Sequence, residues 1–220
     1  MPEMLFVGRE IHKGICLRTM DEDEPQNSKP AKKRRGPRKA TAKYLENSAA
    51  YYLGRFASSS ANLRQLMMLK VRRSETEHGT DPVEGAKFVD DIIAKFERLG
   101  FLNDTAYAEM RARSLHAKGT PLRGIRYKLQ QKGISEEDTE AALVALEDEV
   151  RANSLDLAAA LVLARRRRLG PYLSEDAAVR DARRDKDMAV MARAGFSYDV
   201  VLQVIESPSV EELELAVYGT

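Results

Sequence analysis

The sequence predicts an all-α protein, and three observations lead to that prediction. Alanine, leucine and arginine are abundant, aromatic residues make up 6% of the chain and tryptophan is absent, a balance that favours helices over a β-sandwich. Apolar residues recur at helical spacing in the body of the chain, between Gly, Pro, Ser and Asp residues that begin or end helices. No segment reads as a strand. With 220 residues, 43% of them hydrophobic, the chain can bury a sizeable core.

The first three helices follow from their caps and from the residues between them. A helix is expected over 42–56, and Ser60 can cap a second helix over 60–71. The polar segment 72–80 reads as a spacer. A third helix, over 82–99, begins at an Asp-Pro pair, which suits an N-cap and a first turn. It ends before a glycine, which suits the left-handed residue that follows a helix.

The same pattern continues to the end of the chain. Ser135 begins a capping box of the S-x-x-D kind, and Gly195 ends one helix before Ser197 caps the next. Nine helices are expected in all, followed by a short turn or helix over 210–217. After the first three, the expected helices span 104–117, 121–133, 135–146, 154–169, 174–194 and 197–206.

Two segments resemble each other at a constant offset of 62 residues, 129–143 and 191–205. In both, a helix ends at glycine, an apolar residue follows and a serine caps the next helix. The matched pairs are Leu129 with Met191, Gly133 with Gly195, Ile134 with Phe196, Ser135 with Ser197, and Ala142-Leu143 with Val204-Ile205. Such periodicity indicates a helical array whose units lean on their neighbours, although Gly-apolar-Ser is also common between helices in general.

The N-terminal region differs from the helical body in composition and charge. Residues 21–40 are polar, contain proline and hold no large apolar residue, so we expect them to be disordered. The segment 21–24 is acidic, whereas 29–43 holds eight Lys or Arg and no acid. From residue 44 onward the chain has 25 basic and 28 acidic residues, a net charge of −3. Met20 directly precedes this tail, and one hypothesis is that translation starts there, which leaves 1–19 untranslated.

Several classes of protein are disfavoured. No run of about 18 apolar residues exists, so no membrane span is expected, and 1–19 lacks a signal-peptide cleavage site. The single cysteine, Cys16, suits a reducing cytoplasm. The histidines His12, His78 and His116 are expected at separate, exposed places and lack metal-ligand spacing. Because no phosphate-binding loop or nucleophile motif occurs either, we expect no catalysis, no metal and no cofactor.

The stretch 100–134 is unusually basic, with seven Lys or Arg against two acids. A solvated helix surface normally mixes its signs. A helical wheel predicts that Tyr107, Met110, Ser114 and Ala117 form the buried stripe of its first helix, and that Ile125 and Leu129 face inward from its second. The basic candidates for binding phosphates or an acidic protein are Arg111, Arg113, Lys118, Arg123, Arg126, Lys128 and Lys132. A solvated face is the alternative, and no helix carries the pattern needed to read particular bases.

Two weaker groups of candidates are also basic. One is a run of four consecutive arginines, which points around its helix, so at least one of them should lie near the buried stripe. Some of these arginines are expected to pair with Asp181, Asp185 or Asp187. The other group lies in the tail, where it either binds DNA without specificity or only improves solubility. The weaker candidates are Arg165, Arg166, Arg167, Arg168, Lys32, Lys33, Arg34 and Arg35.

Three segments follow one another in a fixed order along the chain: YLGRFASSSANLRQLMMLKVRRS at 52–74, LGFLNDTAYAEMRARS at 99–114 and RGIRYKLQQKGI at 123–134. This ordered set resembles the RecX family, regulators of the RecA recombinase built from three tandem three-helix repeats. The resemblance covers residues 44–206. The first repeat departs from the pattern, with Lys-Val-Arg where the middle repeat has Lys-Gly, and the third carries an insertion near 171–186.

The resemblance implies an elongated array of helical repeats. It places three-helix repeats at 44–100, 101–150 and 151–208. They follow a disordered, basic N-terminal tail over 1–43 and precede a turn or short helix over 209–220.

The resemblance also implies a function. RecX-like proteins bind the RecA filament on single-stranded DNA and modulate, mostly by inhibition, its recombinase, ATPase and coprotease activities, within DNA repair, recombination and the SOS response. The basic middle repeat would then face DNA phosphates or acidic protein in the filament groove. We expect a cytoplasmic monomer that needs no cofactor and no membrane. Two alternatives are a non-specific DNA-binding protein that acts without RecA, and a helical scaffold for another protein.

Overall fold

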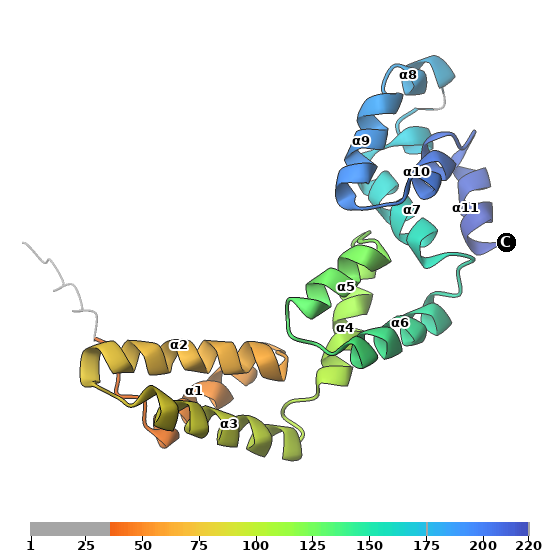
Figure 1. Ribbon diagram of the computed structural model, residues 1–220. Coiled ribbons are helices and arrows are strands. Elements are labelled where there is room, and N and C mark those ends of the chain that lie inside the picture. The colour runs from red at the N-terminus through yellow and green to blue at the C-terminus, as the bar shows by residue number, and fades with distance from the viewer. Residues whose placement is uncertain (1–35, 175, 220) are drawn as a thin grey trace, which may run out of the picture. The chain divides into compact units, whose positions relative to one another are not determined.

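The structure is a computed structural model that describes residues 36–174 and 176–219 (Figure 1). Within these ranges it contains eleven α-helices and one 3₁₀-helix, and no strand. The prediction of an all-α protein is therefore confirmed. The predictions for residues 1–35, which include the Met20 start and the basic run from Lys32 to Arg35, lie outside the described residues.

The first three helices pack together around one hydrophobic core. They form the first helical group, which consists of α1 (Ala42–Leu53), α2 (Ser60–His78) and α3 (Pro82–Arg98). Leu45 of α1, Leu63 of α2 and Val89 of α3 are fully buried in this core. At Gly85 of α3, a Cβ atom would come within 2.4 Å of Val71 Cγ1 on α2. The glycine therefore allows these two helices to approach closely.

Helix α2 is longer than expected, because the segment 72–80 is mostly helical and is not a spacer. Ser74 continues the buried stripe of α2, and its Oγ accepts a hydrogen bond from Ala40 N at 2.8 Å and lies 2.5 Å from Thr80 Oγ1. Because this residue is polar, the helical spacing of apolar residues does not indicate that the buried stripe continues to it. The helix ends at Gly79, whose φ of 62° is left-handed. Ala40, expected in the tail, is buried in the first core.

The second helical group surrounds a second core and consists of α4 (Asp104–His116), α5 (Leu122–Gln130) and α6 (Glu136–Val150). Ile125 and Leu129 of α5 are fully buried, as predicted. The stripe predicted for α4 is wrong, because Met110 is 43% exposed and Ala117 is also exposed. The residues that α4 buries are Ala108, Ala112, Leu115 and His116.

The error on α4 has a physical cause. Helix α4 packs along α6, and alanines at the contact let two helices approach closely. A hydrophobic wheel instead places the largest apolar residues inward. Tyr107 and Ser114, which were predicted to be buried, are half-buried.

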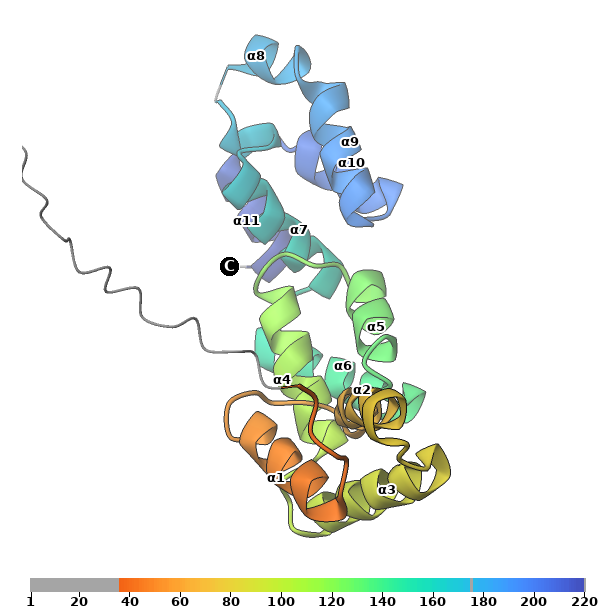
Figure 2. The same ribbon diagram turned by 90° about the vertical axis from the view of Figure 1, so that its left-hand side faces the viewer.

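The remaining helices form the third helical group around a third core. Its elements are α7 (Leu155–Arg167), the 3₁₀-helix η1 (Gly170–Tyr172), α8 (Ala177–Asp181), α9 (Arg184–Ala194), α10 (Tyr198–Ile205) and α11 (Val210–Tyr218). The helix expected over 174–194 is divided into α8 and α9. Because α8 buries none of its residues, no core contact holds it in line with α9. Helix α11 lies beside α7 in both views (Figures 1 and 2) and adds Leu213 and Val217 to the third core.

The two segments that resemble each other at an offset of 62 residues share one local geometry. Gly133 and Gly195 both have left-handed φ values, 70° and 99°. Ile134 and Phe196, which follow them, are each 6% exposed. The serines that come next cap α6 and α10 through their side-chain oxygens. The second and third helical groups therefore end one helix and begin the next in the same way.

Candidate functional site

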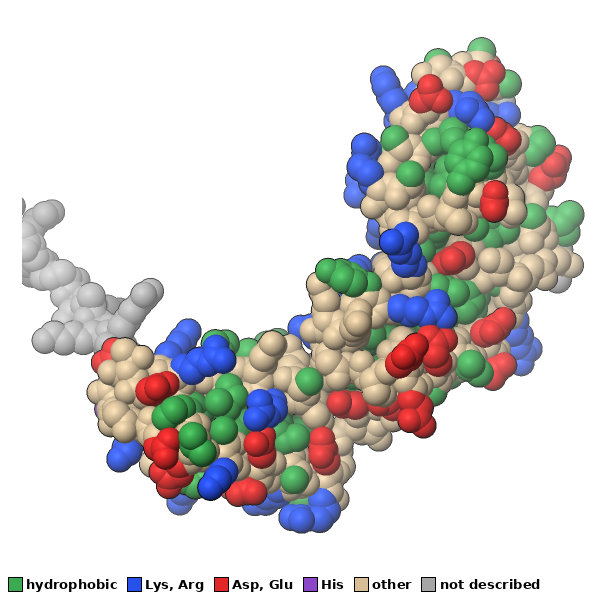
Figure 3. Space-filling view, in the orientation of Figure 1, with side chains coloured by type: hydrophobic (Ala, Val, Ile, Leu, Met, Phe, Trp, Pro, Cys, Tyr) green, Lys and Arg blue, Asp and Glu red, His purple; other side chains and the backbone are tan. Residues whose placement is uncertain are grey.

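Two of the seven predicted basic residues of the middle stretch are held in ion pairs with α6. Arg126 forms a forked pair with Glu140, with Nε–Oε1 and Nη2–Oε2 distances of 2.8 and 3.0 Å. These hydrogen bonds raise the pKa of Arg126 and lower the pKa of Glu140. Arg113 Nη1 lies 3.4 Å from Glu149 Oε2. Figure 3 shows acidic side chains gathered over α6, and these two arginines partly neutralise them.

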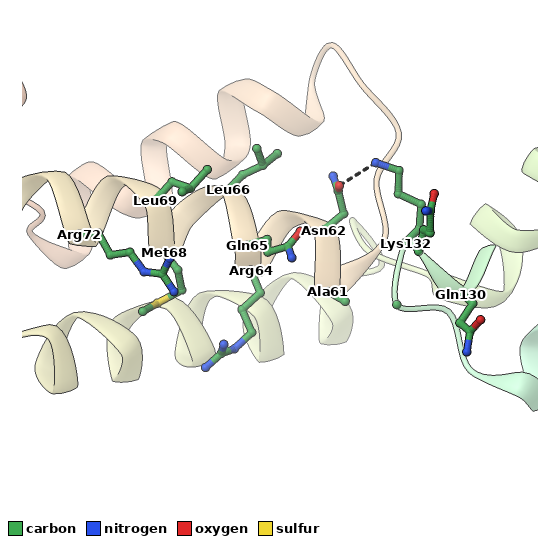
Figure 4. Close-up of a pocket in the computed structure, with 12 residues that line it drawn as sticks. Ala61, Asn62, Arg64, Gln65, Leu66, Met68, Leu69, Arg72, Gln130 and Lys132 are labelled. Atoms are coloured by element: carbon green, nitrogen blue, oxygen red, sulfur yellow. Dashed lines mark hydrogen bonds between the residues drawn. The ribbon is translucent and has the colours of Figure 1, made fainter. Parts of the chain in front are cut away.

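Lys132 is held between the first and second helical groups (Figure 4). Its Nζ donates to Asn62 Oδ1 at 2.9 Å, and its backbone carbonyl accepts from Ser59 Oγ at 2.5 Å. Because the amide of Asn62 is neutral and Lys132 pairs with no acid among the described residues, Lys132 keeps its positive charge there.

Arg111 and Arg123 lie on different helices of the second helical group. Arg111 is half-buried on α4, and its buried Nε has no hydrogen-bond partner in the described part of the chain. Its charge partly offsets the effect of burial on Tyr107, whose pKa is raised mainly by burial. Arg123, near the start of α5, is exposed and forms no ion pair with a described residue. Neither residue belongs to the cluster that the remaining two candidates form.

Lys118 and Lys128 meet Arg166 and Arg167 around one groove of about 400 Å³. Lys118 follows α4, Lys128 lies in the last turn of α5, and the two arginines lie in the last turn of α7. All four are exposed, and none pairs with an acid within 36–174 or 176–219. None of the described residues that line this groove is acidic, and we call it the cationic groove. The structure thus brings together two groups of candidates that the sequence predicts separately.

The run of four arginines differs from its prediction in exposure. All four are exposed, whereas at least one was expected near the buried stripe. The reason is that α7 ends at Arg167, and Arg168 has a left-handed φ of 55°. Arg165, Arg166 and Arg167 thus lie in the last turn of α7, Arg168 leaves the helix, and the buried face of α7 stops at Ala164.

The pairing expected for these arginines is also wrong. Arg165 Nη2 donates to Glu214 Oε1 at 2.5 Å, and its guanidinium lies over the ring of Tyr172, 5.7 Å from the centroid. Among the described residues, none of the four arginines forms an ion pair with the expected partners Asp181, Asp185 and Asp187. Arg166 and Arg167 therefore keep their charge available in the cationic groove.

The turn between α4 and α5 is held against α7 at Gly119. Its φ is 75°, and a Cβ atom there would lie 2.8 Å from Leu163 N and 2.9 Å from Ala159 O. Only glycine fits so close to another backbone in this conformation. Lys118 precedes this glycine, and Arg167 lies one helical turn after Leu163. The close contact therefore places the lysine beside the arginines of α7.

Two buried or half-buried polar contacts fix the same turn. His116, which was expected to be exposed, is 6% exposed and donates from Nε2 to Leu155 O at 2.9 Å. Asp156 Oδ1 accepts from Leu122 N at 2.7 Å and so caps α5, which has no side-chain cap from its own N-cap residue. Sequence reasoning missed both contacts, because each joins residues more than 30 positions apart and leaves no local pattern.

The described residues offer little other chemistry. In the part of the chain that the structure describes, no group of three or more His, Cys, Asp or Glu could hold a metal ion. None of the described helices is long and apolar enough to cross a membrane. His78, predicted to lie in a spacer, ends α2, and its Nε2 lies 2.8 Å from Pro37 O. The cationic groove is therefore suited to binding anionic groups through charge and hydrogen bonds.

Known proteins resemble this chain over most of its length. A family model for the second three-helix domain of RecX matches residues 103–143. The regulatory protein RecX of Myxococcus xanthus strain DK1622 is 38% identical over 188 residues, which cover 84% of this chain and 98% of that protein. The regulatory protein RecX of Agrobacterium fabrum strain C58 is 33% identical over 172 residues, 78% of this chain and 86% of that protein. The crystal structure of RecX from Lactobacillus salivarius has the same fold, with a TM-score of 0.52 at 23% identity over 79% of this chain and 97% of that chain.

Proposed function

The chain belongs to the RecX family of regulatory proteins, and on that premise we propose that it binds the RecA filament on single-stranded DNA and inhibits its recombinase, ATPase and coprotease activities. The family is one of regulators and not of enzymes. In this proposal the repeats at 44–100, 101–150 and 151–208 lie along the filament and contact neighbouring RecA subunits. The protein acts as a monomer in the cytoplasm, without a cofactor.

The cationic groove is the observation that supports this proposal most directly. Its lining holds four cations, and no acid within residues 36–174 and 176–219 lines it; the cations are Lys118, Lys128, Arg166 and Arg167. A filament on single-stranded DNA presents phosphates and acidic protein surfaces, and uncompensated cations attract both. Arg113 and Arg126, although predicted as candidates, are engaged by α6 and contribute less.

The test is the ATP hydrolysis of RecA on single-stranded DNA, with the RecA of the same organism, titrated with the full chain. The variant Lys128→Ala/Arg166→Ala removes one cation from each side of the groove. We expect it to need about tenfold more protein for half-inhibition, because losing roughly 1.4 kcal/mol of binding free energy weakens an equilibrium tenfold.

The matched control is Lys87→Ala/Arg98→Ala, which makes the same charge change on α3. Both residues are exposed and neither pairs with a described acid. We expect this control to inhibit RecA as the unchanged chain does. Equal inhibition by both double variants would remove the cationic groove from the mechanism. No inhibition by the unchanged chain at equal stoichiometry with RecA would overturn the proposed function itself.

The same groove supports a second candidate, non-specific DNA binding without RecA, because phosphates alone can satisfy its charges. This function predicts that the chain binds an oligothymidine without RecA, with an affinity that falls steeply as salt increases. Removing Lys128 and Arg166 would reduce the slope of log affinity against log salt by about 1.4, or about 0.7 for each phosphate contact. Inhibition of RecA without such binding would exclude this candidate.

A further inference from the structure

A second groove lies between α2 and the turn that joins α5 to α6 (Figure 4). Its volume is about 640 Å³, and it shares no lining residue with the cationic groove. Asn62 and Lys132 face each other across it, joined by their hydrogen bond. Its lining, drawn from the described part of the chain, contains neither an acidic nor an aromatic residue. We call it the amide groove.

Side-chain amides line both sides of this groove. Asn62 and Gln65 come from α2, and Gln130 and Gln131 come from the end of α5 and the turn that follows. The three glutamines are exposed, so their amides can reach a ligand. An amide both donates and accepts hydrogen bonds. An extended peptide segment presents the same two functions along its backbone, which makes it a suitable partner for such a groove.

The charge of the amide groove is positive. Arg72 is exposed and pairs with no acid in the described ranges, and the side chain of Lys132 bonds only the neutral amide of Asn62. The third cation, Arg64, is neutralised by Asp90, with an Nε–Oδ1 distance of 2.7 Å. Two uncompensated cations and no lining acid favour an acidic ligand.

The apolar part of the lining distinguishes a peptide from a nucleic acid. Leu66, Met68 and Leu69 line the groove, and Leu69 is 48% exposed. These side chains suit aliphatic groups, whereas single-stranded nucleic acids bind by stacking their bases on aromatic side chains, which this groove lacks. We infer that the amide groove binds an acidic, extended segment of a partner protein, with aliphatic side chains between its carboxylates. The inference goes beyond the proposed function, because it does not require that this partner be RecA.

The test uses the full chain and fluorescence anisotropy. The probe is a short fluorescein-labelled peptide of alternating acidic residues and leucine. We expect saturable binding, and we expect Arg72→Ala to weaken it about tenfold, because a charge-assisted hydrogen bond at a binding site is lost. Lys132→Met, which keeps the apolar stem of the side chain, should weaken it to a similar extent.

The neighbouring arginine provides the matched control. Arg73 is also exposed on α2 but does not line the groove, so Arg73→Ala should change the affinity less than twofold. Equal weakening by Arg72→Ala and Arg73→Ala would show attraction by general charge and would overturn the inference, as would absence of saturable binding. An oligothymidine that displaces the peptide from the unchanged chain but not from Arg72→Ala would assign the groove to nucleic acid instead.

Discussion

The two joints between the helical groups use one capping device in two different surroundings. At the first joint, Asp104 at the start of α4 accepts a hydrogen bond from Ser60 N at 2.8 Å and so caps α2. At the second joint, Asp156 at the start of α7 accepts from Leu122 N at 2.7 Å and so caps α5. In each case the first helix of one group caps the second helix of the group before it.

The joints differ in what lies beside the cap. At the first joint, Gly133 contacts the side chain of Ala61 next to the amide groove, whereas at the second, Gly119 contacts the backbone of α7 next to the cationic groove. A neighbouring side chain can move or be replaced by a smaller one to make room for an added Cβ, whereas a helix backbone cannot. The comparison teaches that a repeated device can fix the order of the groups while the residues around it give each joint a different chemistry.

The largest effect is expected at the backbone contact of the second joint. Gly119→Ala should lower the free energy of unfolding by about 3 kcal/mol, because it adds left-handed strain of roughly 1 kcal/mol to overpacking of roughly 2 kcal/mol. Urea denaturation followed by circular dichroism measures this loss.

Gly79→Ala is the control for backbone strain alone. Gly79 has a similar φ of 62°, but a Cβ there would meet no atom of a described residue within 4 Å. We expect a loss of about 1 kcal/mol. If Gly119→Ala and Gly79→Ala lower the free energy of unfolding equally, then Gly119 is not packed as closely against the backbone of α7 as the structure shows.

An intermediate effect is expected at the first joint, where the contact can be relieved. Gly133 has a φ of 70°, and a Cβ there would lie 2.3 Å from Ala61 Cβ. Gly133→Ala should cost about 2 kcal/mol, and adding Ala61→Gly should recover about 1 kcal/mol of it as a coupling energy. Urea denaturation of the unchanged chain, the two single variants and the double variant provides the double-mutant cycle that measures this coupling energy. Strictly additive losses would contradict a direct contact between these residues.

Local features of the fold could be predicted from the sequence, and features that depend on packing could not. The recurring glycine, apolar residue and serine at Gly133 and Gly195 are local, and the structure has them in the same conformation. By contrast, the extension of α2 depends on Ser74, a polar side chain satisfied by Ala40 N far away in the sequence. Nothing in the local pattern indicates that this serine is buried.

The candidate site shows the same limit. All four cations of the cationic groove were identifiable from the sequence as basic, yet their grouping depends on Gly119, which brings Lys118 to Arg166 and Arg167. The sequence also gives no sign that α6 neutralises Arg126 through Glu140. Which charges are free is decided by tertiary contacts, and only the list of charges is local.

The smallest effect tests whether the two joints are equivalent in their caps. Asp104→Ala and Asp156→Ala should each lower the free energy of unfolding by about 1 kcal/mol, the usual cost of removing a helix cap. Asn at either position keeps an acceptor oxygen and should cost only a few tenths of that. Because the two caps share no partner, the losses should add in the double alanine variant. A loss of unfolding free energy at Asp156 several times that at Asp104 would contradict this equivalence. It would mean that the buried hydrogen bond from His116 to Leu155 O depends on the second cap. The second joint would then unfold as one cooperative unit, unlike the first.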